Sequence, residues 1–245
     1  MIKIPIPPKT LMFLDKNEIE FLKAGDSTLK IINKYIEIKD DISVLDIGCG
    51  YGRLAHAFIR NKKFHGEYIG IDILPEHIKW CKANLVDLCG KRINFYCIDM
   101  KNEVYNPNGT LNIKNVNLDI APVDLVTVIN VFNHMHYEDV RNYLYKIYDL
   151  LDNKGKVYIV LFLLNDEQRK LELQNKSSLP MKYGCERFYK YYCKCSPLYA
   201  IAYEEGILIK LFNELSYKVE DISYGSWCGR KNKTSYEDII ILSKN

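Results

Sequence analysis

The sequence lacks an apolar segment long enough to cross a bilayer. Its longest apolar run, VYIVLFLL at 157–164, has eight residues, whereas a membrane-spanning helix needs about 20. The opening MIKIPIPPKT is interrupted by prolines, and the apolar core of a secretory signal does not follow it. We therefore expect a cytoplasmic protein without membrane contact, whose eight cysteines are reduced thiols and not a disulfide framework.

A strong charge of either sign is also absent. The formal net charge is +3, and the densest basic runs, RNKK at 60–63 and GRKNK at 229–233, are short. Nucleic-acid-binding arms carry longer basic runs than these. Hydrophobic residues make up 48% and charged residues 27% of the 245 positions, which is typical of one globular domain. We therefore expect no nucleic-acid partner.

Apolar runs alternate with helical patterns along most of the chain, which indicates an α/β fold with a parallel sheet. The runs that predict strands lie at 43–48, 67–73, 93–99, 123–131 and 156–164. Helices are predicted between them at 53–61, 75–88 and 137–151, and an amphipathic helix precedes them at 28–38. In the 137–151 segment, Val140, Leu144, Ile147 and Leu151 recur every three or four residues, as one buried helix face requires.

The last part of the chain is less regular. Residues 165–200 are rich in aromatic and turn-forming residues without a clean period, and such long insertions are typical of lids. We expect this lid over the carboxyl edge of the sheet, where open α/β folds bind ligands. A helix at 202–215 follows, then strands at 217–225 and 238–244. Two strands without an intervening helix must pair as a hairpin, so the last strand should be antiparallel.

A glycine-rich turn follows the first predicted strand. Residues 44–53 read VLDIGCGYGR, with Gly48, Gly50 and Gly52 at alternate positions. A dinucleotide-binding turn needs glycine or alanine at the sixth position from Gly48, where this chain has Arg53. A P-loop is excluded as well, because no Gly-Lys-Ser/Thr follows. The turn is therefore not predicted to hold a pyrophosphate, which excludes a nicotinamide-dependent oxidoreductase.

Acidic residues lie at or near the ends of three successive predicted strands: Asp46, Asp72 and Asp99. An acid repels a pyrophosphate but attracts an ammonium or sulfonium group. The pattern therefore indicates a nucleoside with a cationic end and no phosphates, a description that S-adenosylmethionine fits. We expect Asp46 to orient the cationic end, Asp72 to accept the ribose hydroxyls and Asp99 to accept the adenine amine. The glycines would let the backbone approach the amino-acid part, and the other residues expected at the cofactor are Cys49, Ile73, Met100 and Asn130.

These motifs resemble those of class I, Rossmann-like S-adenosylmethionine-dependent methyltransferases. VLDIGCGYGR matches that family's first motif, YIGIDI its ribose-binding strand and CIDM its adenine-side strand. The stretch NVFNHMHYEDVRNYLYKIYDLLDNKGKVYI is similar to its fourth and fifth motifs. NEVYNPNG (102–109) and YGSWCGR (224–230) resemble segments of a bacterial subgroup often found with surface-glycan biosynthesis.

The resemblance implies a seven-stranded, mostly parallel sheet with helices on both faces and an antiparallel last strand. We describe residues 1–245 as a single methyltransferase domain. It would comprise an N-terminal helical cap (1–42), a cofactor-binding core (43–164), a lid insertion (165–200) and a C-terminal helix and hairpin (201–245).

The segment NVFNHMH after the fourth strand should face the acceptor. Methylation of a hydroxyl requires removal of its proton, and an imidazole titrates near neutrality. His134 occupies the position of a histidine in the family pattern and is our candidate general base, although it can equally cap the next helix or pack under the cofactor. His136 is expected on the substrate side. Transfer from a sulfonium can also rely on positioning alone, without a strong base.

Further substrate-side candidates come from the two subgroup segments. Trp227 and Arg230 suit a phosphate, carboxylate or sugar, or a salt bridge that ties down the last hairpin. Tyr105 precedes a predicted NPNG turn at 106–109, and the subgroup resemblance implies a role for it on the substrate side.

The cysteines do not predict a metal site. The Cys193-x-Cys195 pair lacks a second pair at metal-binding spacing, even with Cys185 and Cys228 considered. Cys49 and Cys97 are interpreted as small residues in tight packing.

The sequence thus predicts a methyltransferase that uses S-adenosylmethionine, releases S-adenosyl-L-homocysteine and acts as a monomer or homodimer. The resemblance favours O-methylation of a sugar or glycan precursor, which could be phosphorylated or nucleotide-linked. Two alternatives stay open: a non-catalytic S-adenosylmethionine-binding subunit and a protein-modifying methyltransferase. A DNA methyltransferase is disfavoured, because the fourth strand ends in NVFN and no Pro-Cys dipeptide occurs.

Overall fold

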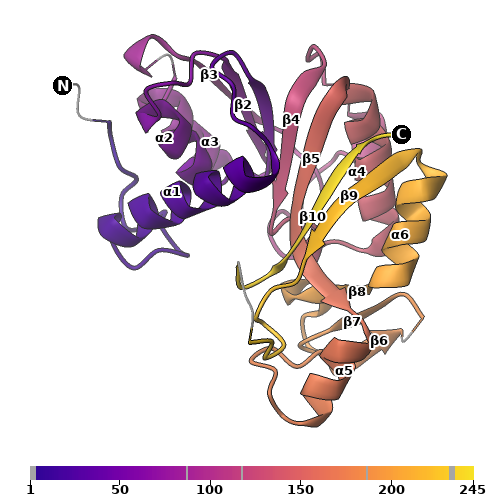
Figure 1. Cartoon of the computed structure of the whole chain (residues 1–245). Coiled ribbons are helices and arrows are strands. Elements are labelled where there is room, and N and C mark those ends of the chain that lie inside the picture. Colours follow the sequence, from indigo (N-terminus) through magenta and orange to yellow (C-terminus); the bar gives the residue numbers. More distant parts are fainter. Residues whose placement is uncertain (1–3, 87, 117, 186, 232–234) are drawn as a thin grey trace.

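The protein folds around one sheet that has helices on both faces (Figure 1). The computed structural model describes residues 4–86, 88–116, 118–185, 187–231 and 235–245. Within these residues the central strands follow the order β3, β2, β1, β4, β5, β10, β9. In chain order they are β1 (Ser43–Ile47), β2 (Glu67–Asp72), β3 (Arg92–Cys97), β4 (Val123–Ile129), β5 (Leu151–Leu164), β9 (Tyr217–Ser223) and β10 (Asp238–Lys244).

Strands β1 to β5 pair in parallel, and β10 is antiparallel to both β5 and β9. The predicted α/β fold with an antiparallel last strand is thereby confirmed. The register aligns Asp46 of β1 with Gly70 of β2 and Thr127 of β4. The carboxyl ends of the parallel strands therefore meet at one edge, the lower end of the sheet in Figure 1.

Five helices form the two outer layers over the described part of the sheet. One face is covered by α1 (Glu18–Tyr35), α2 (Arg53–Arg60) and α3 (Pro75–Asn84), and the other by α4 (Tyr137–Leu150) and α6 (Glu205–Glu214) (Figure 1). Alternate residues of a strand point to opposite faces. Accordingly, Val44 packs in the core under α1 to α3, and Leu45 packs in the core under α4 and α6.

Local signals explain where the helices begin. Helix α1 starts ten residues before the amphipathic segment predicted at 28–38, because the Asn17 side chain caps it by accepting a hydrogen bond from the Glu20 N–H at 3.0 Å. Pro75 occupies the first turn of α3, where its missing N–H costs nothing. Val140, Leu144 and Ile147 are buried on one face of α4, as predicted.

The segment 165–200 extends the sheet beyond its carboxyl edge. It contains α5 (Asp166–Leu173), β6 (Tyr183–Cys185) and β7 (Tyr189–Tyr191). Strand β7 pairs with β6 and with β8 (Ile201–Glu204), and β8 runs parallel to the last three residues of β5. The helix predicted at 202–215 therefore starts only at Glu205, since residues 201–204 are held in the sheet.

None of the helices in the described residues combines the length and apolar character that crossing a bilayer requires.

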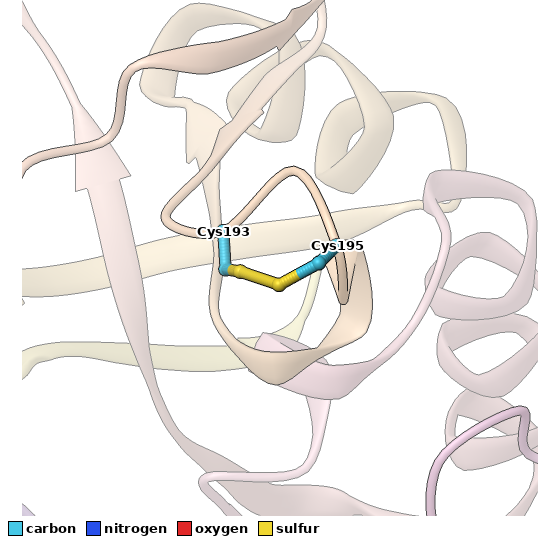
Figure 2. Close-up of a disulfide and its surroundings, with 2 residues drawn as sticks. All are labelled: Cys193 and Cys195. Atoms are coloured by element: carbon cyan, nitrogen blue, oxygen red, sulfur yellow. A yellow bond between two sulfur atoms is a disulfide. The ribbon is translucent and has the colours of Figure 1, made fainter.

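The cysteines differ in part from the prediction. Figure 2 shows a disulfide between Cys193 and Cys195, whose Cα atoms are 5.5 Å apart. The expectation that all the thiols are reduced is therefore wrong for this pair, because it was drawn from the expected compartment and not from geometry. Cys49 is buried, whereas Cys97 is exposed and is not the tightly packed residue that was predicted.

Candidate functional site

The glycine turn after β1 leaves open space at its tip. Gly48, Gly50 and Gly52 all have positive φ, at 77°, 55° and 82°. A Cβ on Gly48 would lie 2.2 Å from Val131 Cγ2, so the turn packs tightly against the segment after β4. A Cβ on Gly50 would meet no described atom within 4 Å. Gly48 is thus required for packing, whereas Gly50 borders free space in which a ligand can approach the backbone.

Asp46 lies beneath this turn and is 3% exposed. One carboxylate oxygen accepts a hydrogen bond from Thr127 Oγ1 at 2.6 Å, and the other accepts one from the Tyr68 hydroxyl. Burial raises the pKa of Asp46 to about 6, against the opposing effect of these two hydrogen bonds. Both oxygens are therefore engaged by neighbouring strands, and because the carboxylate is also buried, Asp46 is placed to act on a ligand through its charge and not by direct contact.

Asp72 joins the end of β2 to the tip of the glycine turn. Its Oδ2 accepts a hydrogen bond from the Gly50 N–H at 2.7 Å, and its Oδ1 accepts one from the Leu74 N–H at 2.9 Å. Each carboxylate oxygen keeps a further lone pair, because a carboxylate can accept about four hydrogen bonds. Asp72 therefore has the capacity to bind two ribose hydroxyls.

Asp99 is exposed and organises the loop that follows β3. Its carboxylate accepts hydrogen bonds from Asn106 Nδ2 at 3.0 Å and from Thr110 Oγ1 at 2.7 Å. These hydrogen bonds, with one from the Thr110 N–H, hold the pKa of Asp99 below its usual value. The NPNG turn is thus anchored on the acid expected to meet the adenine. Next to it, Met100 is buried, and its sulfur accepts a hydrogen bond from the Tyr143 hydroxyl at 3.1 Å.

A pocket of about 300 Å³ lies between the end of β2, the loop after β3 and the start of α4. Of the predicted site residues, Ile73, Met100 and His136 line it. The other lining residues are Lys101, Asn102, Glu103, Gly109, Thr110, Leu111, Asn112, Ile113, Met135, Asp139, Tyr143 and Leu198. The site therefore has an apolar side near Ile73 and Met100 and a polar side near Glu103, His136 and Asp139.

Sequence reasoning missed the polar residues of α4 that face this pocket. Asp139 and Tyr143 lie three and seven positions after His136, a spacing that places all three on one helix face. That periodicity was available in the sequence and could have indicated them. Burial raises the pKa of Asp139, and its neighbour His136 opposes this effect. His136 Nε2 lies 3.4 Å from Glu103 Oε1, a contact that links the loop after β3 to the start of α4.

His134 packs beside the pocket but is not among its lining residues. Its Nδ1 lies 2.9 Å from the Leu198 carbonyl oxygen, which can only accept, so Nδ1 carries the proton. Its ring meets the Tyr105 ring edge-on, with 5.1 Å between the centroids. Burial lowers the pKa of His134, so the neutral form is favoured. His134 and Tyr105 thus connect the loops after β3 and β4 to the segment 165–200 at Leu198.

Asn130 follows β4 in a left-handed conformation, with φ at 56°. Its Nδ2 donates a hydrogen bond to Glu237 Oε1 at 3.3 Å. Glu237 immediately precedes β10 and was not among the predicted site residues, because a lone acid at the start of a strand carries no distinguishing pattern.

The expectation that Trp227 and Arg230 bind substrate is corrected by their burial. Trp227 has no exposed surface, and its indole N–H donates to Asp238 Oδ2 at 2.7 Å. Arg230 forms ion pairs with Asp238 at 3.2 Å and with Glu167 at 2.9 Å. The alternative interpretation, a salt bridge that ties down the last hairpin, is therefore what the structure contains. Within the described residues, no group of three or more His, Cys, Asp or Glu side chains is arranged to hold a metal ion.

A family model described as a methyltransferase domain matches residues 19–192. The chain belongs to this methyltransferase family. The resemblance to the methyltransferase family is thereby confirmed.

The relatives agree with this assignment. The chain is 26% identical over 148 residues to a sphingolipid C9-methyltransferase from Komagataella phaffii, a match that covers 59% of this chain and 28% of that relative's length. A Pyrococcus horikoshii protein of 14% identity has a TM-score of 0.62, with 97% of this chain and 96% of that chain covered.

A Burkholderia thailandensis 1,6-didemethyltoxoflavin-N1-methyltransferase, solved with its acceptor and S-adenosylhomocysteine, is also 14% identical. Its TM-score is 0.55, and 93% of this chain and 80% of that chain are covered. At these identities the solved structures show the fold.

Proposed function

We propose that the methyltransferase acts on a small polar acceptor held in the pocket between the loop after β3 and the start of α4. The observation that supports this proposal is the position of that pocket. Its apolar wall contains Ile73 and Met100, which directly follow the two acids expected to hold ribose and adenine. Its lining also includes Glu103, His136 and Asp139, side chains that can bind hydroxyl groups.

The residues present fit the cofactor. The space beside Gly50 accepts a ligand against the backbone, and Asp72 has lone pairs for two hydroxyls. We propose that Gly48, Gly50 and Gly52 shape the seat of the amino-acid end, with Cys49 and Asn130 beside it. When bound, S-adenosylmethionine supplies an electrophilic methyl group next to the pocket. The Asp99 carboxylate is anchored in its own loop, so we propose that it meets the adenine amine through a remaining lone pair.

A sugar or glycan precursor is the acceptor class that we propose. Sugar hydroxyls are bound well by carboxylates and imidazoles, and Lys101 at the pocket can pair with a phosphate of a phosphorylated or nucleotide-linked sugar. The reaction would then be an O-methylation. His136 lines the pocket and is an imidazole that can receive the hydroxyl proton. The general-base role of His134 stays a prediction, and its contacts with Leu198 and Tyr105 support a positioning role for it.

The test is methyl transfer from radiolabelled S-adenosylmethionine to a panel of free sugars, sugar phosphates, nucleotide-linked sugars, phenols and amines. Label in a sugar-containing product supports the proposal, and the rate should fall in His136→Gln. Label in phenols or amines alone would refute the acceptor class. Cofactor binding without transfer to any acceptor would favour the non-catalytic subunit, and label in protein would favour a protein-modifying enzyme.

A further inference from the structure

Glu237 is a partly buried acid whose carboxylate is hydrogen-bonded by its own backbone N–H and by one other side chain. It lies just before β10, and burial raises the pKa of its carboxyl. Among the side chains that the structure describes, Asn130 is the one that donates a hydrogen bond to it, at 3.3 Å and to Oε1. Removing a carboxylate from water without full hydrogen bonding is unfavourable. A cationic ligand would offset this cost.

Glu237 is connected to the glycine turn through Asn130. Its partner Asn130 is followed by Val131, which packs against the Cα of Gly48 on the turn. Arg53 begins α2 at the other end of the turn, and its charge lowers the pKa of Glu237 as well as that of Asp46. The guanidinium and the Glu237 carboxylate are within electrostatic reach, but they do not form an ion pair with each other in the described chain.

Arg53 keeps donors available on this side of the turn. Its one ion pair within the described residues is with Asp15, at 3.5 Å, and its side chain is 32% exposed. A guanidinium has five N–H donors and can bind a carboxylate with two of them. The open space beside Gly50 lies on the same turn.

The Glu237 carboxylate and the remaining donors of the Arg53 guanidinium match the two charges of an α-amino acid. Asp46, expected from the sequence to orient the cationic end, has both oxygens engaged by Thr127 and Tyr68. We propose that the Glu237 carboxylate accepts a hydrogen bond from the ammonium group of S-adenosylmethionine. Arg53 would bind the carboxylate at the same amino-acid end. This inference rests on the cofactor assignment. It adds a binding residue from the last strand, and it gives Asp46 a role beneath the turn instead of at the ligand.

The test is isothermal titration with three nucleosides that differ in these charges. S-adenosylhomocysteine carries both the ammonium and the carboxylate, S-adenosyl-3-thiopropylamine carries the ammonium alone, and 5′-methylthioadenosine carries neither. Glu237→Gln should weaken the first two about 10- to 100-fold and leave the third unchanged, as expected for loss of a charge-assisted hydrogen bond. Arg53→Gln should weaken S-adenosylhomocysteine alone. Glu214→Gln, at an exposed acid on α6, is the matched control.

The inference is overturned if Glu237→Gln binds S-adenosylhomocysteine like the wild type, or if it loses all three ligands equally. Thermal unfolding of each variant identifies a general loss of folding. If the wild type binds none of the three nucleosides, the cofactor assignment fails together with the inference. If the wild type binds S-adenosylhomocysteine and the variants do not show the expected pattern, the inference alone is overturned.

Discussion

Replacing Gly50 by alanine should separate the binding role of the glycine turn from its role in folding. Both Gly48 and Gly50 have positive φ, and an alanine in the left-handed region costs about 1–2 kcal/mol. A methyl group on Gly50 meets no described atom within 4 Å, so this strain is the whole expected loss. A methyl group on Gly48 would lie 2.2 Å from Val131, which adds an overpacking cost of about 1–3 kcal/mol.

The free energy of unfolding should therefore fall by about 1–2 kcal/mol in Gly50→Ala and by about 2–5 kcal/mol in Gly48→Ala. For a chain of this length, each kcal/mol corresponds to a Tm change of about 2–4 °C. Despite the smaller loss, Gly50→Ala should bind S-adenosylhomocysteine at least 10-fold more weakly, because its methyl group fills space that the cofactor needs. Thermal unfolding and titration calorimetry measure the two effects. A folded Gly50→Ala protein with wild-type affinity would refute the account of this turn.

Three other substitutions test the site and its surroundings. In Asp46→Asn the pH dependence of stability should change: the folded pKa of about 6 exceeds the unfolded value of 3.8, so the wild type loses about 2 kcal/mol as the pH rises from 4 to 7. The variant should lack that loss. An equal fall in the free energy of unfolding from pH 4 to pH 7 in the variant and the wild type would contradict the prediction. Trp227→Phe should destabilise the fold by about 1–3 kcal/mol by removing the donor to buried Asp238, with acceptor KM unchanged; a raised KM would restore its substrate role. His136→Gln should lower kcat more than His134→Gln does, since only the former lines the pocket, and the reverse order would favour His134 as the base.

The sequence was informative where local patterns decide the structure. Positive φ at Gly48, Gly50 and Gly52 follows from a turn that only glycine adopts easily, and Pro75 indicated the start of α3. The hairpin of β9 and β10 follows from two strands without a helix between them.

Long-range partners explain what the sequence did not reveal. The end of β5 is uniformly apolar, and nothing in that composition shows that it leaves the central sheet to pair with β8. Trp227 and Arg230 have the composition of a sugar-binding loop, and their burial depends on Asp238 and on Glu167, 63 positions before Arg230. Burial and pairing of this kind are tertiary properties, which a single sequence does not encode in a readable pattern.

The central claim is that the carboxyl edge of the sheet binds S-adenosylmethionine through the end of β2. Its most direct test is calorimetric titration of S-adenosylhomocysteine, with NAD in parallel, into the wild type and into Asp72→Ala. The account predicts saturable binding of S-adenosylhomocysteine to the wild type, no binding of NAD, and an affinity at least 10-fold weaker in Asp72→Ala, because the ribose loses its acceptors. Equal affinity in the two proteins, or no binding to the wild type, would contradict it.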